Sequence, residues 1–170
     1  MGNMQRVGDL EVPQDLDFEH RSWSVQRISW IIFSLIMGAA LLGLLGEGPL
    51  SAATAGGDGA PLQVQYGRFV RHRGATQMEI KLQPGAVQGD EARVWVDREY
   101  LNGVELHNVL PEPESVEAGP DRYVYVFKLS EPGGGADISF DLMPVRNGVR
   151  TVQVGLEGGP ELSFTQVVWP

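Results

Sequence analysis

Nineteen consecutive residues without a charged side chain, 28–46 (ISWIIFSLIMGAALLGLLG), interrupt a 170-residue chain that is otherwise polar and acidic. An α-helix rises about 1.5 Å per residue, so this run is long enough to cross a hydrocarbon core roughly 30 Å thick. We therefore predict one transmembrane helix over residues 28–46. This run constrains the architecture more than any other feature, because the remaining segments must lie on one side of a membrane or the other.

A secretory signal peptide is the alternative interpretation of the apolar run. Ala53-Thr54-Ala55 has the small-x-small form of a signal-peptidase site shortly after it. Against this, the charged leader before the run is long, and the run exceeds the about 7 to 15 residues of a signal-peptide core. We predict an uncleaved membrane anchor.

The basic residues around the run predict its orientation. Arg21 and Arg27 lie close to its N-terminal side, whereas no Lys or Arg follows it until Arg68. The positive-inside rule then makes residues 1–27 a cytoplasmic leader. The chain beyond the helix is expected in the periplasm, with the helix in the bacterial inner (cytoplasmic) membrane.

Two groups of helix residues have predicted roles. Trp23, Arg27 and Trp30 are expected to anchor the cytoplasmic end, because indole rings favour the interface and arginine reaches the headgroups. Small residues four apart allow close packing against a second helix in lipid, and this spacing occurs twice, in the pairs Ser34 and Gly38, and Ala39 and Gly43. The alternative is that these small residues are merely tolerated, since Gly and Ala are common in membrane helices.

The rest of the chain predicts a tether and one small domain. Residues 47–60 are rich in Gly and Ala and are typical of a flexible linker. Residues 61–170 suffice for a single core. The chain has no cysteine, which excludes disulfides and thiolate metal sites, and its net charge of -9 argues against nucleic acid and against a basic patch binding anionic lipid.

Alternating hydrophobicity after residue 61 predicts β-strands. Ile138, Phe140 and Leu142 alternate with polar residues. The dipeptides Asn102-Gly103 and Asn147-Gly148 favour type I′ hairpin turns. About eight strands follow, and we predict an all-β domain, an antiparallel immunoglobulin-like β-sandwich. A small barrel is the alternative.

The sequence contains few candidates for catalytic or metal-binding residues. The histidines His20, His72 and His107 are widely separated, and no known catalytic or nucleotide-binding motif occurs. Acidic pairs such as Asp90-Glu91 are expected to be solvated loop charges, with weak calcium binding as the alternative. We predict no catalytic residue, no metal and no cofactor, and hence no enzyme.

Three stretches carry a resemblance. They are Trp23-x3-Arg27-x2-Trp30, AGPDRYVYVF at residues 118–127 and the final FTQVVWP. Together they resemble a group of uncharacterised bacterial single-pass membrane proteins with an exported β-domain. The plan of the chain is also similar to that of accessory subunits of bacterial photosynthetic reaction-centre and antenna complexes, or of respiratory complexes.

These observations favour a non-catalytic accessory subunit of a larger membrane complex. Its helix would pack against other transmembrane subunits within the lipid bilayer, and its β-domain would cap the complex from the periplasm. A membrane-tethered module that binds a small ligand or a peptide is the alternative, and it would require a concave site with convergent polar groups.

Overall fold

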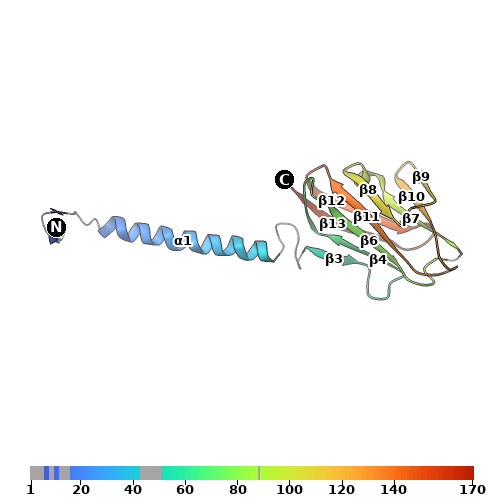
Figure 1. The fold of residues 1–170 in the computed structure, drawn as a ribbon, viewed down its shortest axis with the longest axis horizontal. Helices are drawn as coiled ribbons and strands as arrows, with labels where there is room; N and C mark the ends of the chain where they lie inside the picture. Colours follow the sequence, from blue (N-terminus) through green and yellow to red (C-terminus); the bar gives the residue numbers. More distant parts are fainter. Residues whose placement is uncertain (1–5, 8–9, 12–15, 43–50, 88) are drawn as a thin grey trace. The chain divides into compact units, whose positions relative to one another are not determined.

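The computed structural model describes residues 6–7, 10–11, 16–42, 51–87 and 89–170 (Figure 1). The chain divides into two compact units, residues 1–39 and 40–170, and each is described by itself. In the first unit, β1 (Arg6–Val7) and β2 (Leu10–Glu11) pair antiparallel, and α1 runs from Leu16 to Leu41.

Helix α1 begins well before the predicted span of residues 28–46. The segment before residue 28 lacks Gly and Pro after Leu16, so nothing in it ends a helix. Within α1, the 19 residues Trp23–Leu41 are long and apolar enough to cross a membrane, a property that a membrane anchor and a signal sequence share. The predictions for Gly43 and for the linker residues 47–50 lie outside the described residues.

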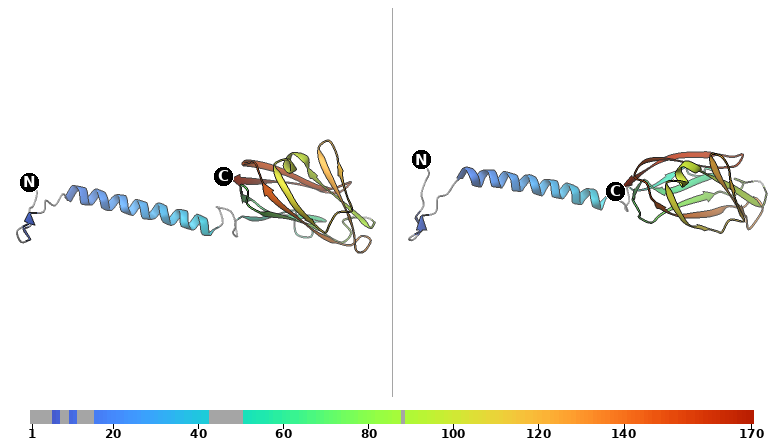
Figure 2. Two further views of the ribbon diagram at one scale, coloured as in Figure 1. Left: turned by 45° about the horizontal axis from the view of Figure 1, so that its top comes forward. Right: turned by 90° about the horizontal axis from the view of Figure 1, so that it is seen from above.

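The second unit is a β-sandwich of eleven strands in two sheets (Figures 1 and 2). The six-stranded sheet has the order β5 (Phe69–Arg71), β13 (Glu161–Trp169), β12 (Gly148–Leu156), β7 (Glu91–Asp97), β10 (Arg122–Lys128) and β9 (Ser115–Ala118). The five-stranded sheet has the order β3 (Ala52–Ala55), β4 (Leu62–Gly67), β6 (Thr76–Leu82), β11 (Ala136–Pro144) and β8 (Val104–Leu110). A short helix, α2 (Arg98–Leu101), follows β7.

The strand count exceeds the predicted eight because three short edge strands are added. Strands β3, β5 and β9 have only three or four residues each, too few to show a periodic pattern. Strand β3 lies within the predicted linker 47–60, so the sandwich begins before residue 61. Strand β5 pairs parallel with β13, which makes the six-stranded sheet mixed rather than purely antiparallel.

Both predicted Asn-Gly hairpins are wrong. Strands β7 and β8 belong to different sheets, as do β11 and β12, so each Asn-Gly lies in a connection that crosses the sandwich. A type I′ turn needs positive φ at both central residues. Asn102 instead has a φ of -69° as the C-cap of α2, and Arg73 is the only non-glycine residue with positive φ in the described part of the chain.

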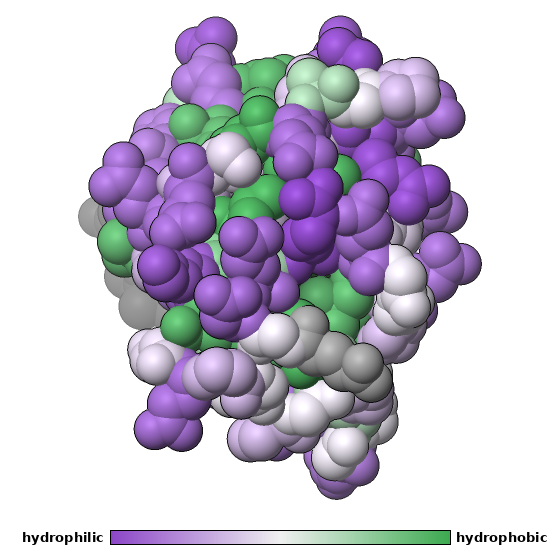
Figure 3. All heavy atoms as spheres, turned by 90° about the vertical axis from the view of Figure 1, so that its right-hand side faces the viewer, coloured by the Kyte–Doolittle hydropathy of each residue, from purple (hydrophilic) through white to green (hydrophobic). Residues whose placement is uncertain are grey.

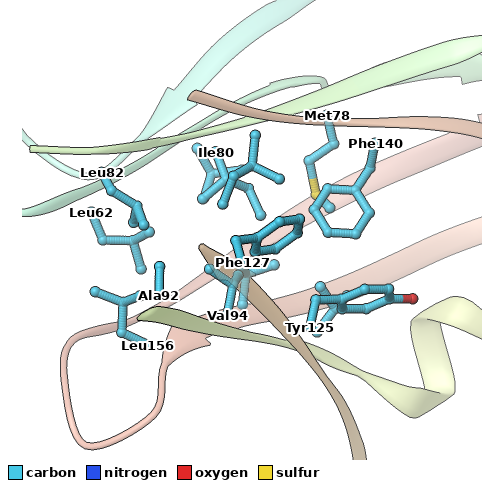
Figure 4. Packing of buried hydrophobic residues seen from close by; sticks show 14 of the residues in the cluster. Leu62, Met78, Ile80, Leu82, Ala92, Val94, Tyr125, Phe127, Phe140 and Leu156 are labelled. Carbon is cyan, nitrogen blue, oxygen red and sulfur yellow. The ribbon is translucent and has the colours of Figure 1, made fainter. Parts of the chain in front are cut away.

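The core fills the space between the sheets (Figure 4). Phe127 of β10 and Phe140 of β11 are its largest fully buried side chains, and they come from opposite sheets. The predicted alternation of Ile138, Phe140 and Leu142 is confirmed, since all three are buried. Burying a side chain of this size stabilises the fold by about 1.5–3 kcal/mol.

Candidate functional site

Helix α1 exposes its apolar side chains along the whole span. The side chains of Trp23–Leu41 are mostly exposed. The large side chains concerned are Val25, Ile28, Ile31, Ile32, Phe33, Leu35, Ile36, Met37 and Leu41. A contiguous apolar surface of this size requires lipid or a protein partner to cover it.

The predicted interface residues lie close together at one end of this span. The Arg27 guanidinium lies over the Trp23 ring, 4.3 Å from its centroid, in a cation–π contact. Trp30 meets Phe33 edge to face, with centroids 6.4 Å apart. This arrangement suits the boundary between headgroups and hydrocarbon, where indole rings and arginines gather.

Part of the predicted packing face can be described. Ser34 and Gly38 lie about one turn apart on the same side of α1. Ala39 is the next residue in the helix and lies on the adjacent side. A Cβ added at Gly38 would meet no atom within 4 Å, so the space beside it is open to a partner helix. Gly43 lies outside the described residues.

The sandwich carries an open groove on its five-stranded sheet, of about 1380 Å³. Its floor includes polar side chains of four strands, Gln65, Gln77, Glu79, His107 and Asp141, and Phe69 and Arg71 of β5 line one end. The Gln77 amide donates a hydrogen bond to the Ser139 hydroxyl at 2.6 Å. Such a surface offers hydrogen bonds to a polar or extended ligand.

Sequence reasoning missed this groove. Its residues are distant in the chain and meet only because β4, β6, β11 and β8 are neighbours in one sheet. The available signal was the polar half of each alternating strand, such as Gln77 and Glu79 on β6. That signal marks an outward face without saying which strands share it.

The histidines do not come together. His107 Nε2 lies 3.9 Å from Glu105 Oε2, both exposed. His72 has its Nδ1 buried with no hydrogen-bond partner among the described residues. The side chain of His20 lies outside the described residues. Across the described residues, no group of three or more His, Asp or Glu side chains gathers in a way that could hold a metal ion.

The outer face of the six-stranded sheet carries an ion-pair network. Arg93 donates hydrogen bonds to Glu117 and Glu157, and the hydrogen bond to Glu117 is 2.7 Å long. The hydrogen bonds from Arg93 hold the pKa of the Glu117 carboxyl below its ordinary value. Nearby, Arg122 stacks on Trp95 at 4.4 Å. Within this network the charges of Arg93, Glu117 and Glu157 neutralise one another.

Comparison with known proteins finds similarity among solved structures alone. No protein-family model matches the chain, and no curated protein matches it. Among solved structures, the chain is similar to the cohesin module of a family 33 glycoside hydrolase from Clostridium perfringens, with a TM-score of 0.41 and 12% identity, over 69% of this chain and 96% of that one. A similarity this low carries no functional information.

Proposed function

We propose that the protein is a non-catalytic accessory subunit of a larger bacterial membrane complex, held by α1 and capping the complex with its β-sandwich. The observation that carries the proposal is the exposed apolar span Trp23–Leu41, which the rest of the chain leaves uncovered. Lipid covers part of such a span, and the open Gly38 face suits a neighbouring helix. A bioenergetic complex, photosynthetic or respiratory, is the parent assembly we propose.

Strand β3 supports an uncleaved anchor over a signal peptide. The small-x-small segment Ala53-Thr54-Ala55 forms most of β3, which pairs with β4 from Ala52 to Ala55. The Ser51 hydroxyl, just before it, is buried and donates a hydrogen bond of 2.8 Å to the Phe69 carbonyl. Cleavage after Ala55 would remove this edge strand and its hydrogen bonds. Loss of β3 from the five-stranded sheet is a reason to favour a chain that is not cleaved at this site.

The orientation we propose places residues 1–27 in the cytoplasm and the sandwich in the periplasm. It rests on Arg21 and Arg27, which precede the span, while no basic residue follows it before Arg68.

The decisive experiment is retention in the native complex. Gly38→Leu should hold the helices apart and lower the amount of this subunit that copurifies in mild detergent by several-fold, whereas the control Leu41→Ile should leave it unchanged. Wild-type retention in Gly38→Leu, together with purification of the wild type without any membrane protein partner, would contradict the proposal.

The groove favours a second candidate, a membrane-tethered module that binds a ligand or peptide in the periplasm. Its polar floor, including Glu79 and Asp141, fits a ligand that is polar or positively charged. The test is whether a library of basic peptides binds to the full chain in detergent. Binding that is lost in the double variant Glu79→Gln with Asp141→Asn would favour this candidate. Equal binding by the double variant would argue against the groove.

A further inference from the structure

One end of the sandwich exposes a cluster of apolar side chains on the outer face of the six-stranded sheet. Val149 pairs with Val167, and Val167 pairs with Phe69, so the three lie in a row across β12, β13 and β5. Trp169 lies two residues further along β13, with its ring 6.5 Å from that of Phe69. Val149 is 73% exposed and Trp169 is 42% exposed. We call Phe69, Val149, Val167 and Trp169 the apolar end patch.

Four exposed arginines surround this patch. Arg68 precedes β5, Arg71 pairs with Trp169, Arg73 follows β5, and Arg146 lies in the connection before β12. The Arg73 amide donates to the Pro144 carbonyl, which brings the two loops together. In the described part of the chain none of these four forms an ion pair, in contrast to Arg93, which is paired with two glutamates.

The chain enters the sandwich at the end that carries this patch. Ser51, where the described part of the domain begins, accepts a 2.6 Å hydrogen bond from the Arg68 amide and donates one to the Phe69 carbonyl. Helix α1 ends at Leu41, ten residues earlier. An extended chain covers at most about 3.6 Å per residue, so the connection limits the distance from Leu41 to Ser51, which contacts Phe69 of the patch, to roughly 36 Å.

The opposite end of the sandwich has a different surface. Its turns carry the exposed carboxylates Asp58, Asp90, Glu131 and Glu157. Figure 3 shows this end, opposite the C-terminus, and hydrophilic side chains cover most of it. The four unpaired arginines and the aromatic rings therefore gather at the tethered end, which also carries the exposed carboxylates Glu99 and Glu105, whereas the charges of the far end are mostly carboxylates with Lys128 among them.

We propose that the apolar end patch and its four arginines dock on the anionic headgroup layer of the bilayer that holds α1. Aromatic side chains partition into the interface. Arginines near an anionic surface gain attraction that acts within a Debye length. The docking rests on the proposal that α1 is an uncleaved anchor.

The absence of cysteine permits a direct test with the full chain. Val149→Cys, labelled with an environment-sensitive fluorophore, reports on the patch, and labelled Asp58→Cys is the matched control at the far end. Each is reconstituted in nanodiscs of phosphatidylcholine alone or with phosphatidylglycerol. In nanodiscs that contain phosphatidylglycerol, the fluorescence emission of the Val149 probe should shift to shorter wavelength and be quenched by headgroup spin labels. In phosphatidylcholine alone it should do neither. The Asp58 probe should show no shift and no quenching in either lipid. High salt should reverse the shift.

Charge variants identify the groups responsible. The double variant Arg71→Gln with Arg146→Gln should lower the ratio of docked to undocked domain about 25-fold. The reason is that each basic residue at an anionic surface raises this ratio about fivefold. Co-elution of the chain with nanodiscs, together with a Val149 probe that stays in water in both lipids, would overturn the docking and leave the anchor intact. Failure to co-elute would overturn the anchor and the docking with it. A Val149 probe buried only in native membranes that contain the complex would assign the patch to a protein partner instead.

Discussion

The Tyr100 hydroxyl donates a hydrogen bond of 3.2 Å to the side-chain oxygen of Gln166, and both residues are 2% exposed. The Gln166 amide in turn donates to the Gly67 carbonyl at 2.9 Å. This chain of contacts joins α2 to one strand of each sheet. It closes the sandwich at the end where the chain arrives from α1.

Removing the Tyr100 hydroxyl should therefore destabilise the domain. Tyr100→Phe leaves the Gln166 oxygen buried without its donor, which costs about 1–3 kcal/mol. Urea unfolding of the full chain in detergent, followed by tryptophan fluorescence, would measure the loss. The control Gln153→Leu, on the exposed side of β12, should change the unfolding free energy by less than about 0.5 kcal/mol. An equal loss in both variants would contradict the role of the buried contact.

Stability should also depend on pH through Tyr100. Burial raises the pKa of the Tyr100 hydroxyl above its ordinary value, so the folded state holds the proton more tightly than the unfolded chain. The contribution of this difference to the free energy of unfolding is present in full below about pH 10, the ordinary tyrosine pKa. It is lost as the pH rises above that value. Denaturant midpoints between about pH 9 and pH 11 should fall more steeply for the wild type than for Tyr100→Phe. Parallel slopes would show that Tyr100 is not the titrating group.

Gly155 should not tolerate a side chain. A Cβ there would lie 2.7 Å from the Trp95 ring, which covers this glycine on the outer face of the sheet. Gly155→Ala should cost about 1–3 kcal/mol, because the indole must move from its contact with Arg122. Gly57→Ala is the control, since a Cβ at that position meets nothing within 4 Å. Thermal unfolding of both variants compares them, and a control that melts lower than Gly155→Ala would contradict the packing argument.

The orientation can be tested in spheroplasts. External protease should remove an epitope on the sandwich and spare a tag at the N-terminus, because the proposed orientation, based on Arg21 and Arg27, places the leader in the cytoplasm. Western blots against both ends provide the measurement. Protection of the sandwich with loss of the N-terminal tag would reverse the topology, and a mature chain that begins after Ala55 would identify a signal peptide.

The apolar span and the long strands could be predicted because their signals are local. Hydropathy predicts a span over residues 28–46, which overlaps Trp23–Leu41, and alternation marks strands such as β11, whose pattern of buried residues follows the pleat. Pairing between strands is not local. Asn102-Gly103 and Asn147-Gly148 resemble hairpin turns in isolation, yet the strands before and after each belong to different sheets.

The candidate surfaces could not be predicted for the same reason. The net charge of -9 argued against a basic patch, but a total charge does not show where the charged residues lie in the fold. Arg71 and Arg146 are far apart in the sequence and meet at one end only because β5, β12 and β13 are adjacent. The groove residues Gln65 and Asp141 likewise come from strands separated by β6. Only the sheet order brings such groups together.

The three short edge strands have a consequence for a protein confined to a membrane. Anchoring restricts copies to two dimensions with similar orientation, which raises the rate at which their sheet edges meet. Strands β3, β5 and β9 each offer only three or four residues of open backbone. The fourth edge strand is β8, which carries the exposed Glu105 and His107. Its pairing with β11 has a register shift between Asp141 and Leu142. For copies anchored side by side by α1, as proposed, the described edges are therefore either short or, at the seven-residue β8, paired across a register shift, and both features disfavour joining of sheets between copies.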